Sequence, residues 1–300
     1  MGREAAALKK DGTLLVTGAS GFLGAWVVLE ARARGLSVLG SSRTPLEGFP
    51  WRRADLSRPG EAERLLEEVR PAAVIHAAAS SRIPDCRKDP DLARRINVEA
   101  TAALAAGAAR LGAAFLFVST DHVFDGKSAP YAPGDPPSPL SVYGRTKVQG
   151  EEAVRAAGGD WRVVRVSLLF GRSEGRGNLG ASEGLLALLD RGERPLLFTD
   201  EFRTPLAVDE AARGLLDLLQ APPGRILHLA GPERLSRYDF GVLAVRAAGR
   251  DPALLERGLR TDRAEHASRP ADLSLDCRET LPYLERPPSP PGVALARIYR

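Results

Sequence analysis

The chain has 300 residues, of which 44% are hydrophobic and 27% charged, a composition typical of a soluble globular protein. Its 42 basic and 38 acidic side chains are interspersed without a long basic block, which disfavours a nucleic-acid partner. Cys86 and Cys277 belong to no paired motif, so neither a disulfide framework nor a thiolate zinc site is expected. No apolar run reaches the roughly 18 residues of a membrane helix, and residues 1–12 lack signal-peptide character, so we expect a cytoplasmic protein without a membrane partner.

Short apolar runs alternate with helical stretches along the first 170 residues. The patterns predict strands over 13–17, 37–40, 51–54, 73–77, 115–119 and 162–166. Helices are predicted between them over 22–34, 61–69, 91–111 and 142–157. Alternation of this kind favours the α/β class, with a doubly wound, mostly parallel sheet of the Rossmann type.

The alternation loosens after residue 171. We expect a mobile glycine-rich loop over 171–184, then a helix over 185–191, a strand over 196–198, a helix over 208–220, a strand over 226–229 and a helix over 238–248, before a proline-rich end. The pattern predicts a nucleotide-binding core of residues 1–170, to which 205–230 return. A smaller, interleaved substrate lobe would consist of 171–204 and 231–300.

A glycine turn joins the first predicted strand to the first predicted helix, with Gly18, Gly21 and Gly24 spaced three apart. The first glycine permits a sharp turn, the second lets backbone N–H groups approach a pyrophosphate, and the third lets the helix pack closely on the sheet. The positive end of the helix would face the anion. Because the pattern opens a βαβ unit, it favours a bound dinucleotide over a ligand-free tight turn.

The end of the second predicted strand distinguishes between dinucleotides. An acid there holds the ribose hydroxyls of NAD, whereas a nearby Arg accommodates the 2′-phosphate of NADP. The segment carries Arg43 after two serines and no acid, which predicts NADP(H) over NAD(H), although a plain surface arginine is the alternative. Asp55 and Leu56, after the third strand, are placed to hold the adenine edge, or the acid only caps a helix.

Tyr143 and Lys147 stand four residues apart at the start of a predicted helix, which puts both side chains on one face. An ammonium beside a phenol lowers the phenol pKa, so we expect Tyr143 to act as a general acid and base toward a carbonyl. Such pairs are common on solvated helices. Thr120, at the carboxyl end of the fifth strand, supports the catalytic interpretation, because ligands of open α/β sheets bind outside these strand ends.

The segments TGASGFLG, HAAA, STDHVFDG, PPSPLSVYGRTKVQGE and FRTPLAVDE resemble the extended short-chain dehydrogenase/reductase family, most closely the dTDP-4-dehydrorhamnose reductases. The resemblance implies hydride transfer between NADPH and a ketone of a nucleotide-linked sugar, in a protein that forms a homodimer. It assigns catalysis to Thr120, Tyr143 and Lys147. It adds a set of cofactor contacts, namely Ser20, Phe22, Leu23, Ala77, Ala78, Ala79, Asn97 and Ser119, with Asn97 supporting the lysine through its backbone and water.

On the substrate side, the same resemblance implies Asp121, His122 and Arg203, with His122 at a position where the family usually has tyrosine. Two other functions stay open at this level. One is an NAD-dependent sugar-nucleotide epimerase or dehydratase. The other is a non-catalytic, NADP-binding regulatory subunit like that of methionine adenosyltransferase, because GPERLSRYDFG resembles both groups. The four histidines have no metal-ligand spacing, so no metal site is expected.

Overall fold

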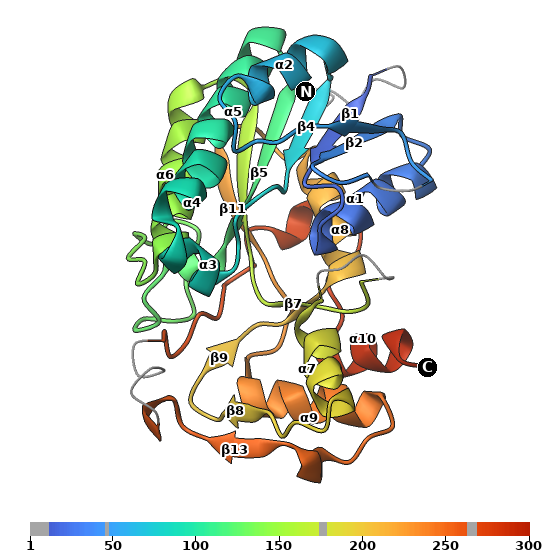
Figure 1. Cartoon of the computed structure of the whole chain (residues 1–300), viewed down its shortest axis with the longest axis vertical. Coiled ribbons are helices and arrows are strands. Elements are labelled where there is room, and N and C mark those ends of the chain that lie inside the picture. Colours follow the sequence, from blue (N-terminus) through green and yellow to red (C-terminus); the bar gives the residue numbers. More distant parts are fainter. Residues whose placement is uncertain (1–11, 46–47, 174–178, 263–268) are drawn as a thin grey trace.

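The computed structural model describes residues 12–45, 48–173, 179–262 and 269–300, and a seven-stranded sheet forms its upper half (Figure 1). All pairings in this sheet are parallel, and the strand order is β11-β6-β5-β4-β1-β2-β3. The strands are β1 (Leu14–Thr17), β2 (Val38–Ser42), β3 (Trp51–Arg53), β4 (Ala73–His76), β5 (Ala114–Thr120), β6 (Trp161–Val166) and β11 (Arg225–Leu229). The order reverses at β1, and ligands of such sheets bind at this reversal, outside the carboxyl ends of the strands.

Helices cover both faces of the sheet, which explains why its central strands are almost continuously apolar. One face carries α1 (Phe22–Ala33) and α8 (Val208–Leu218), which share a buried apolar cluster with β1 and β11. The opposite face carries α2 (Glu61–Val69), α5 (Ala100–Leu111) and α6 (Val142–Ala157). The sheet is therefore doubly wound, and the predicted α/β class is confirmed.

Short helices lead into the second of these layers. They are α3 (Ile83–Lys88), α4 (Pro90–Arg94) and a π-helical turn (Arg95–Glu99), which runs directly into α5. The Ser141 hydroxyl caps α6 by accepting a hydrogen bond from the Gly144 N–H at 3.0 Å. This cap starts the helix immediately before Tyr143, so local sequence positions the predicted catalytic residue.

A smaller lobe lies below the sheet in Figure 1 and has its own core around Phe170 and Phe240. Its helices are α7 (Ala181–Asp190), α9 (Arg237–Ala247) and α10 (Pro291–Ile298). Its short strands pair as β7 (Leu169–Phe170) with β10 (Leu206–Ala207), β9 (Phe202–Arg203) with β12 (Leu235–Ser236), and β8 (Leu196–Phe198) with β13 (Glu256–Gly258). The chain passes from the lobe back to the sheet at α8 and β11.

Some local elements differ from the prediction. The sequence pattern did not predict α3, and the proline-rich end continues into α10, because proline is well tolerated in the first turn of a helix. The predicted loop over 171–184 ends early, since α7 already begins at Ala181; residues 174–178 lie outside the described part of the chain. Among the described residues, no helix is both long and apolar enough to cross a membrane.

Candidate active site

The glycine turn between β1 and α1 is shaped for a close ligand. Gly18 has φ +71°, and a Cβ there would lie 2.7 Å from the backbone of Ala78. A Cβ on Gly24 would lie 2.2 Å from the Gly18 carbonyl oxygen, so only glycine lets α1 approach the turn. No side chain caps α1 at Gly21, and its first turn holds no acid. An uncapped positive helix end suits a pyrophosphate, so these residues fit a dinucleotide.

The other predicted contacts of the turn divide into two kinds. Ser20 is half-buried, and its hydroxyl accepts a hydrogen bond from Thr44 Oγ1 at 3.2 Å. Phe22 and Leu23, in the first turn of α1, pack into the apolar cluster beneath the sheet. The turn therefore presents Ser20 beside the segment after β2, while Phe22 and Leu23 hold α1 in place.

Arg43 is exposed directly after β2, next to Ser42. Ser42 is held by two bonds: it accepts from Trp51 Nε1 at 2.9 Å and donates to the Thr44 carbonyl at 2.5 Å. Arg43 thus follows a well-anchored strand end, and its charge helps to lower the pKa of the Asp55 carboxyl. A guanidinium there suits a 2′-phosphate.

Asp55 follows β3, and its carboxylate accepts from the Ser57 hydroxyl at 2.7 Å and the Ser57 N–H at 3.2 Å. These bonds lower the pKa of Asp55 below its usual value. The carboxylate therefore stabilises its own turn, and it does not cap α2, which begins after Gly60 without a side-chain cap. Beside it, Leu56, Arg58 and Ala62 face Arg95 and Ala103 across a cavity of about 180 Å³.

The three predicted catalytic residues come together at the carboxyl end of β5. The Thr120 hydroxyl donates to Asp121 Oδ1 at 3.1 Å and accepts from the His122 N–H at 3.2 Å. Tyr143 is half-buried. Burial raises the pKa of its phenol above the usual value of 10, and hydrogen bonding with Thr120 opposes this shift only in part. The phenol is consequently protonated at neutral pH and ready to donate.

Lys147 lies one helical turn further along α6 and is only 2% exposed. Its Nζ donates to the Val118 carbonyl at 2.7 Å and lies 3.8 Å from the centre of the Phe117 ring. Burial lowers the pKa of Lys147 to about 7, although the charge of Glu151 acts to raise it. The expectation that Lys147 lowers the pKa of Tyr143 is wrong for this structure, because the ammonium is directed at Val118 and burial dominates at the phenol.

Two further predicted residues have internal partners. The Asn97 side chain, in the π-helical turn, accepts from the Ser80 N–H at 2.8 Å and donates to Thr146 Oγ1 at 3.0 Å. The Ser119 hydroxyl donates to Glu151 at 2.5 Å, deep inside the sheet layer. The Ser119 side chain is thus bonded within the core.

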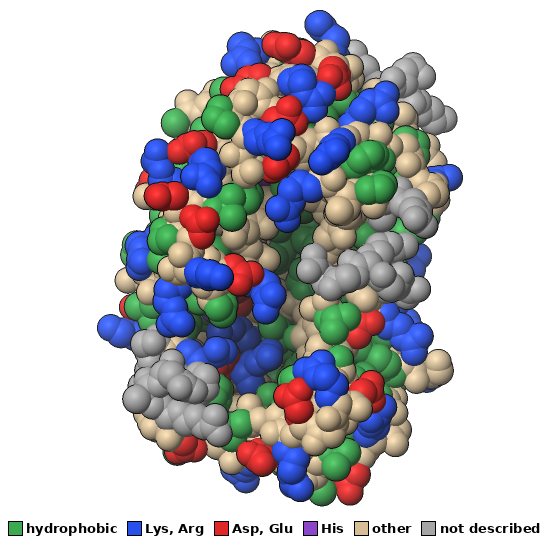
Figure 2. All heavy atoms as spheres, viewed as in Figure 1, with side chains coloured by type: hydrophobic (Ala, Val, Ile, Leu, Met, Phe, Trp, Pro, Cys, Tyr) green, Lys and Arg blue, Asp and Glu red, His purple; other side chains and the backbone are tan. Residues whose placement is uncertain are grey.

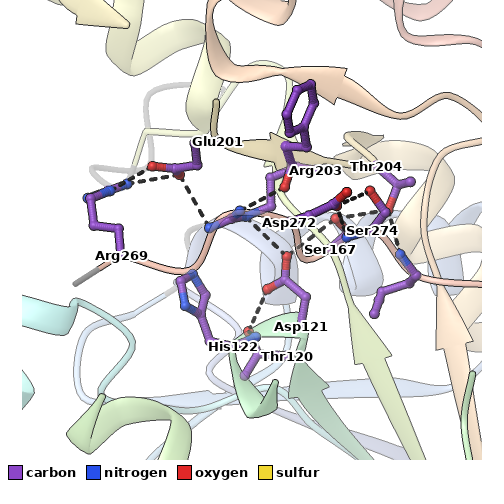
Figure 3. Close-up of polar contacts among 12 residues, drawn as sticks. Thr120, Asp121, His122, Ser167, Glu201, Arg203, Thr204, Arg269, Asp272 and Ser274 are labelled. Atoms are coloured by element: carbon purple, nitrogen blue, oxygen red, sulfur yellow. Dashed lines mark hydrogen bonds and ion pairs between the residues drawn. The ribbon is translucent and has the colours of Figure 1, made fainter. Parts of the chain in front are cut away.

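On the substrate side, Asp121 and Arg203 meet between the sheet and the lobe (Figure 3). Arg203 Nε lies 3.5 Å from Asp121 Oδ2, and Arg203 Nη2 lies 3.3 Å from Glu201 Oε1. Arg269 closes the chain of charges with two bonds to Glu201, at 2.6 and 3.0 Å. Residues distant in sequence therefore form one ionic cluster beside Thr120, in which Asp121, Glu201 and Arg203 are buried and Arg269 is exposed.

Arg237 joins this cluster from the first residue of α9, and sequence reasoning missed it. Burial lowers its pKa to about 10, which the charge of Glu201 opposes. Its Nη1 atom is buried without a hydrogen-bond partner in the described part of the chain. Three guanidinium groups thus face two carboxylates. Figure 2 shows basic side chains within a hollow between the two halves of the molecule.

Glu201 and Arg269 were also missed. The signal for Glu201 was its position directly before the FRTP segment, and that for Arg237 was a charge inside SRYDF at a helix start. Arg269 gave no local signal, because its role depends on the chain returning to Glu201.

His122 lies between Tyr143 and this cluster. Its ring is 6.2 Å from the Tyr143 ring, in an edge-on arrangement, and in Figure 3 it points toward the Glu201–Arg269 pair. Burial lowers the pKa of His122, so the imidazole is neutral at neutral pH. Within the described chain its ring forms no hydrogen bond, which leaves it available to a ligand.

Glu201 gives the cluster a defined response to acid. Burial alone would raise its pKa, but the hydrogen bonds from Arg269 and the charge of Arg203 lower it to about 2. Because the pKa is depressed in the folded state, the stabilisation is present above about pH 4.5 and is lost as pH falls toward 2. We expect the free energy of unfolding, measured by urea titration, to fall by roughly 3 kcal/mol more in the wild type than in Glu201→Gln over that interval. Parallel curves for the two proteins would contradict this.

No group of three or more His, Cys, Asp or Glu side chains able to hold a metal occurs among the residues that the structure describes. The parallel sheet with its glycine turn, and the Thr, Tyr and Lys at the edge of β5, define a short-chain dehydrogenase/reductase of the extended type. Residues 12–296 match the family model described as RmlD substrate binding domain, and the chain belongs to this family. The predicted resemblance is thereby confirmed.

Three curated relatives show the range of the family. The chain is 34% identical to "Probable low-salt glycan biosynthesis reductase Agl14" of Haloferax volcanii, covering 87% of this chain and 88% of the relative. It is 38% identical to the dTDP-4-dehydrorhamnose reductase of Burkholderia thailandensis, covering 67% and 63%. It is also 29% identical to the mouse methionine adenosyltransferase 2 subunit beta, covering 93% and 85%.

Among solved structures, the dTDP-4-dehydrorhamnose reductase of Bacillus anthracis in complex with NADP superimposes with a TM-score of 0.83. The match covers 96% of this chain and 99% of that one, at 21% identity. At this identity the likeness establishes the fold, which agrees with the predicted doubly wound sheet.

Proposed function

We propose that this protein is an NADP(H)-dependent reductase that transfers a hydride to a ketone of a nucleotide-linked sugar. The observation that carries the proposal is the arrangement of Thr120, Tyr143 and Lys147 at the edge of β5, on a sheet whose glycine turn fits a dinucleotide. Reductases among the relatives support the same reaction class. When bound, the dinucleotide supplies the hydride for the carbonyl carbon.

The chain's own residues manage the proton. Tyr143, protonated because burial raises its pKa, donates a proton to the carbonyl oxygen as that oxygen gains charge. The Thr120 hydroxyl orients the same oxygen once it turns its proton from Asp121 Oδ1 to that oxygen, while it still accepts from the His122 N–H. Lys147 lies one helical turn further along α6, where the Val118 carbonyl sets the direction of its ammonium group. In this proposal, Asn97 supports Lys147 through its backbone and water, and Ser119 contacts the cofactor through its backbone.

The substrate lobe supplies recognition of the anionic part of the substrate. Arg203 and Arg237 bring positive charge next to Thr120, and one donor of Arg237 has no partner among the described residues. A nucleotide diphosphate needs such donors, and charge-assisted bonds from arginine are well suited to it. We accordingly assign residues 1–170 and 205–230 to the cofactor core, and 171–204 and 231–300 to the substrate lobe.

A panel of 4-keto sugar nucleotides with different bases, incubated with NADPH or NADH, tests the proposal by loss of absorbance at the nicotinamide band. We expect turnover with at least one member, with NADPH preferred. Tightly held NAD with product isomerisation and no net oxidation would indicate an epimerase or dehydratase instead. Absence of turnover together with a stoichiometric protein partner would indicate a regulatory subunit.

Arg43 is expected to determine the dinucleotide preference. Replacing Arg43 with Ala should raise the Kd for NADPH about tenfold, because one charge-assisted contact to the 2′-phosphate is lost, and should leave the Kd for NADH unchanged. Fluorescence titration of both dinucleotides measures this. Arg52→Ala, an exposed arginine on the neighbouring strand β3, is the matched control. Equal weakening of both dinucleotides by Arg43→Ala would refute the assignment.

Arg237 is expected to affect the sugar nucleotide and not the cofactor. Arg237→Met should raise KM for the sugar nucleotide by about 10- to 100-fold, while the Kd for NADPH changes less than about twofold. Steady-state kinetics and NADPH titration separate the two effects. Arg246→Met, on an exposed site of the same helix α9, should behave as wild type. A change confined to kcat would place Arg237 outside the diphosphate site.

Assembly and compartment complete the proposal. We propose that the protein forms a homodimer, as the family resemblance implies, and that it acts in the cytoplasm, as its composition indicates. Light scattering of the purified protein should give twice the mass of 32.1 kDa, and cell fractionation should recover the activity in the cytosol. A monomeric mass at micromolar concentration would contradict the first part.

A further inference from the structure

A chain of buried polar side chains crosses the layer between β1 and α6, and the reaction described above does not use it. It starts at the Ala78 N–H, 3.4 Å from Thr17 Oγ1, and passes to His76 Nδ1 at 2.7 Å from the same hydroxyl. His76 Nε2 lies 3.0 Å from Thr101 Oγ1, which donates to the Asn97 carbonyl at 2.9 Å. Thr17, His76 and Thr101 are each 0% exposed, so water does not compete for these bonds.

The hydrogen-bonded chain continues from Asn97 into α6, the helix that carries Tyr143. Asn97 Nδ2 donates to Thr146 Oγ1 at 3.0 Å, and Thr146 Oγ1 donates to the Tyr143 carbonyl at 2.8 Å. The second Nδ2 proton goes to the Ser80 carbonyl at 3.0 Å, and Asn97 Oδ1 accepts the Ser80 N–H. Every polar atom of the Asn97 side chain is thus bonded.

Counting the available protons fixes which group donates in each of these hydrogen bonds. Because Thr101 uses its only proton on the Asn97 carbonyl, it must accept from His76, and the imidazole proton must be on Nε2. His76 Nδ1 then accepts from Thr17, whose oxygen is left to accept the Ala78 N–H. The arrangement requires a neutral ring. Burial and the charge of Lys147 lower the pKa of His76 to about 3, in agreement.

The two ends of this hydrogen-bonded chain of side chains lie at the two halves of the active site. Thr17 directly precedes Gly18, and Ala78 forms the wall against which Gly18 packs. Thr17 and His76 are also register partners on the adjacent strands β1 and β4. At the other end, the Tyr143 carbonyl belongs to the first turn of α6. Between them, the π-helical turn places Asn97 beside both Ser80 and Thr146, and such turns are frequent at functional sites.

We propose that His76 is a positioning residue, which with Thr101 fixes the glycine turn of the cofactor site relative to the first turn of the catalytic helix. It touches neither cofactor nor substrate; it acts by holding the distance between the bound dinucleotide and Tyr143. The inference rests on the proposed function for the identity of the two sites that it links.

The first test removes one hydroxyl without changing volume. Thr101→Val should lower kcat by about tenfold and raise the Kd for NADPH several-fold, because the glycine turn and the first turn of α6 are then no longer held at a fixed distance from each other. Thr101→Ser keeps the hydroxyl and should restore both values to within about twofold of wild type. Equal behaviour of the Val and Ser variants would overturn the proposal, since it would show that the hydroxyl is dispensable.

A double-mutant cycle separates a linked chain from two independent packing defects. His76→Leu interrupts the same series of hydrogen bonds as Thr101→Val, so the two effects should not add. In kcat and in the Kd for NADPH, the double variant should match the more impaired single variant within about twofold. If the two effects multiply instead, the residues act independently and the proposal fails.

The third measurement needs no variant and no sugar substrate. Nitrogen-15 NMR of imidazole-labelled wild-type protein should show one histidine that stays neutral between pH 5 and 8 with its proton on Nε2, and this signal should disappear in His76→Leu. A proton on Nδ1, or titration in that range, would overturn the proposal. If no sugar nucleotide is reduced, the proposed function fails, whereas the NMR signal and the NADPH affinities still decide the role of His76.

Discussion

Replacing Tyr143 with Phe is expected to lower kcat for NADPH-dependent reduction of the sugar ketone by about 10²- to 10⁴-fold, the range that a general acid contributes. The phenol hydrogen-bonds with Thr120, and its raised pKa keeps it protonated. Because phenylalanine keeps the ring and loses only the hydroxyl, the Kd for NADPH should change less than about threefold. Steady-state rates and fluorescence titration give the two numbers.

Tyr283→Phe provides the matched control, since this ring packs partly buried against the core on the opposite side of the sheet layer from α6. It should have wild-type kinetics. Thr120→Val should also lower kcat, but by less than Tyr143→Phe, because the Thr120 hydroxyl orients the carbonyl and does not supply the proton. A Tyr143→Phe enzyme within about threefold of wild type would remove Tyr143 from the mechanism.

The largest expected effect on stability comes from Glu151. Its carboxylate accepts from Arg165 Nε at 2.9 Å, from Arg165 Nη2 at 2.7 Å and from the Ser119 hydroxyl at 2.5 Å. The side chains of Glu151 and Arg165 are only 4% and 1% exposed. Glu151→Gln leaves the arginine charge buried without its partner, so the free energy of unfolding should fall by about 3–5 kcal/mol. Urea unfolding at neutral pH measures it.

Glu193→Gln is the matched control for that substitution. Glu193 pairs with Arg191 at 2.8 Å, but both side chains are more than half exposed, so the loss should be below about 1 kcal/mol. A loss in Glu151→Gln as small as in the control would mean that water reaches the Arg165 guanidinium. The double variant Glu151→Leu with Arg165→Met, which leaves no unpaired charge, should recover much of the stability.

Most of the sheet and its helices could be predicted from local pattern. The predicted helices over 61–69 and 142–157 match α2 and α6 at both ends, because amphipathic spacing and the Ser141 cap are local signals. The predicted helix over 91–111 is continuous but contains the π-helical turn, which periodicity does not reveal. The missed α3 and α10 are short and carry proline, so they depend on packing against the rest of the chain.

The candidate site was only partly predictable for the same reason. Gly18, Thr120, Tyr143 and Lys147 stand out because each follows a local rule of spacing or strand end. Arg237 and Arg269 do not, since their role arises where two parts of the lobe meet Glu201. The direction of the Lys147 ammonium was also beyond reach, because the Val118 carbonyl that receives it lies on a different element.

Local sequence pattern was enough to predict the α/β class, the glycine turn, the Tyr and Lys pair and the arginine after β2, because turn geometry and helix spacing are properties of neighbouring residues. The family membership follows from the same motifs. The protonation states of the site residues, and their ion-pair and hydrogen-bond partners, could be found only from the tertiary structure. Burial at Tyr143 and Lys147, the charge cluster around Glu201 and the hydrogen-bonded chain through His76 depend on strands and helices distant in sequence. The free energy of a charge or a donor depends on which groups surround it, and the fold alone brings those groups together.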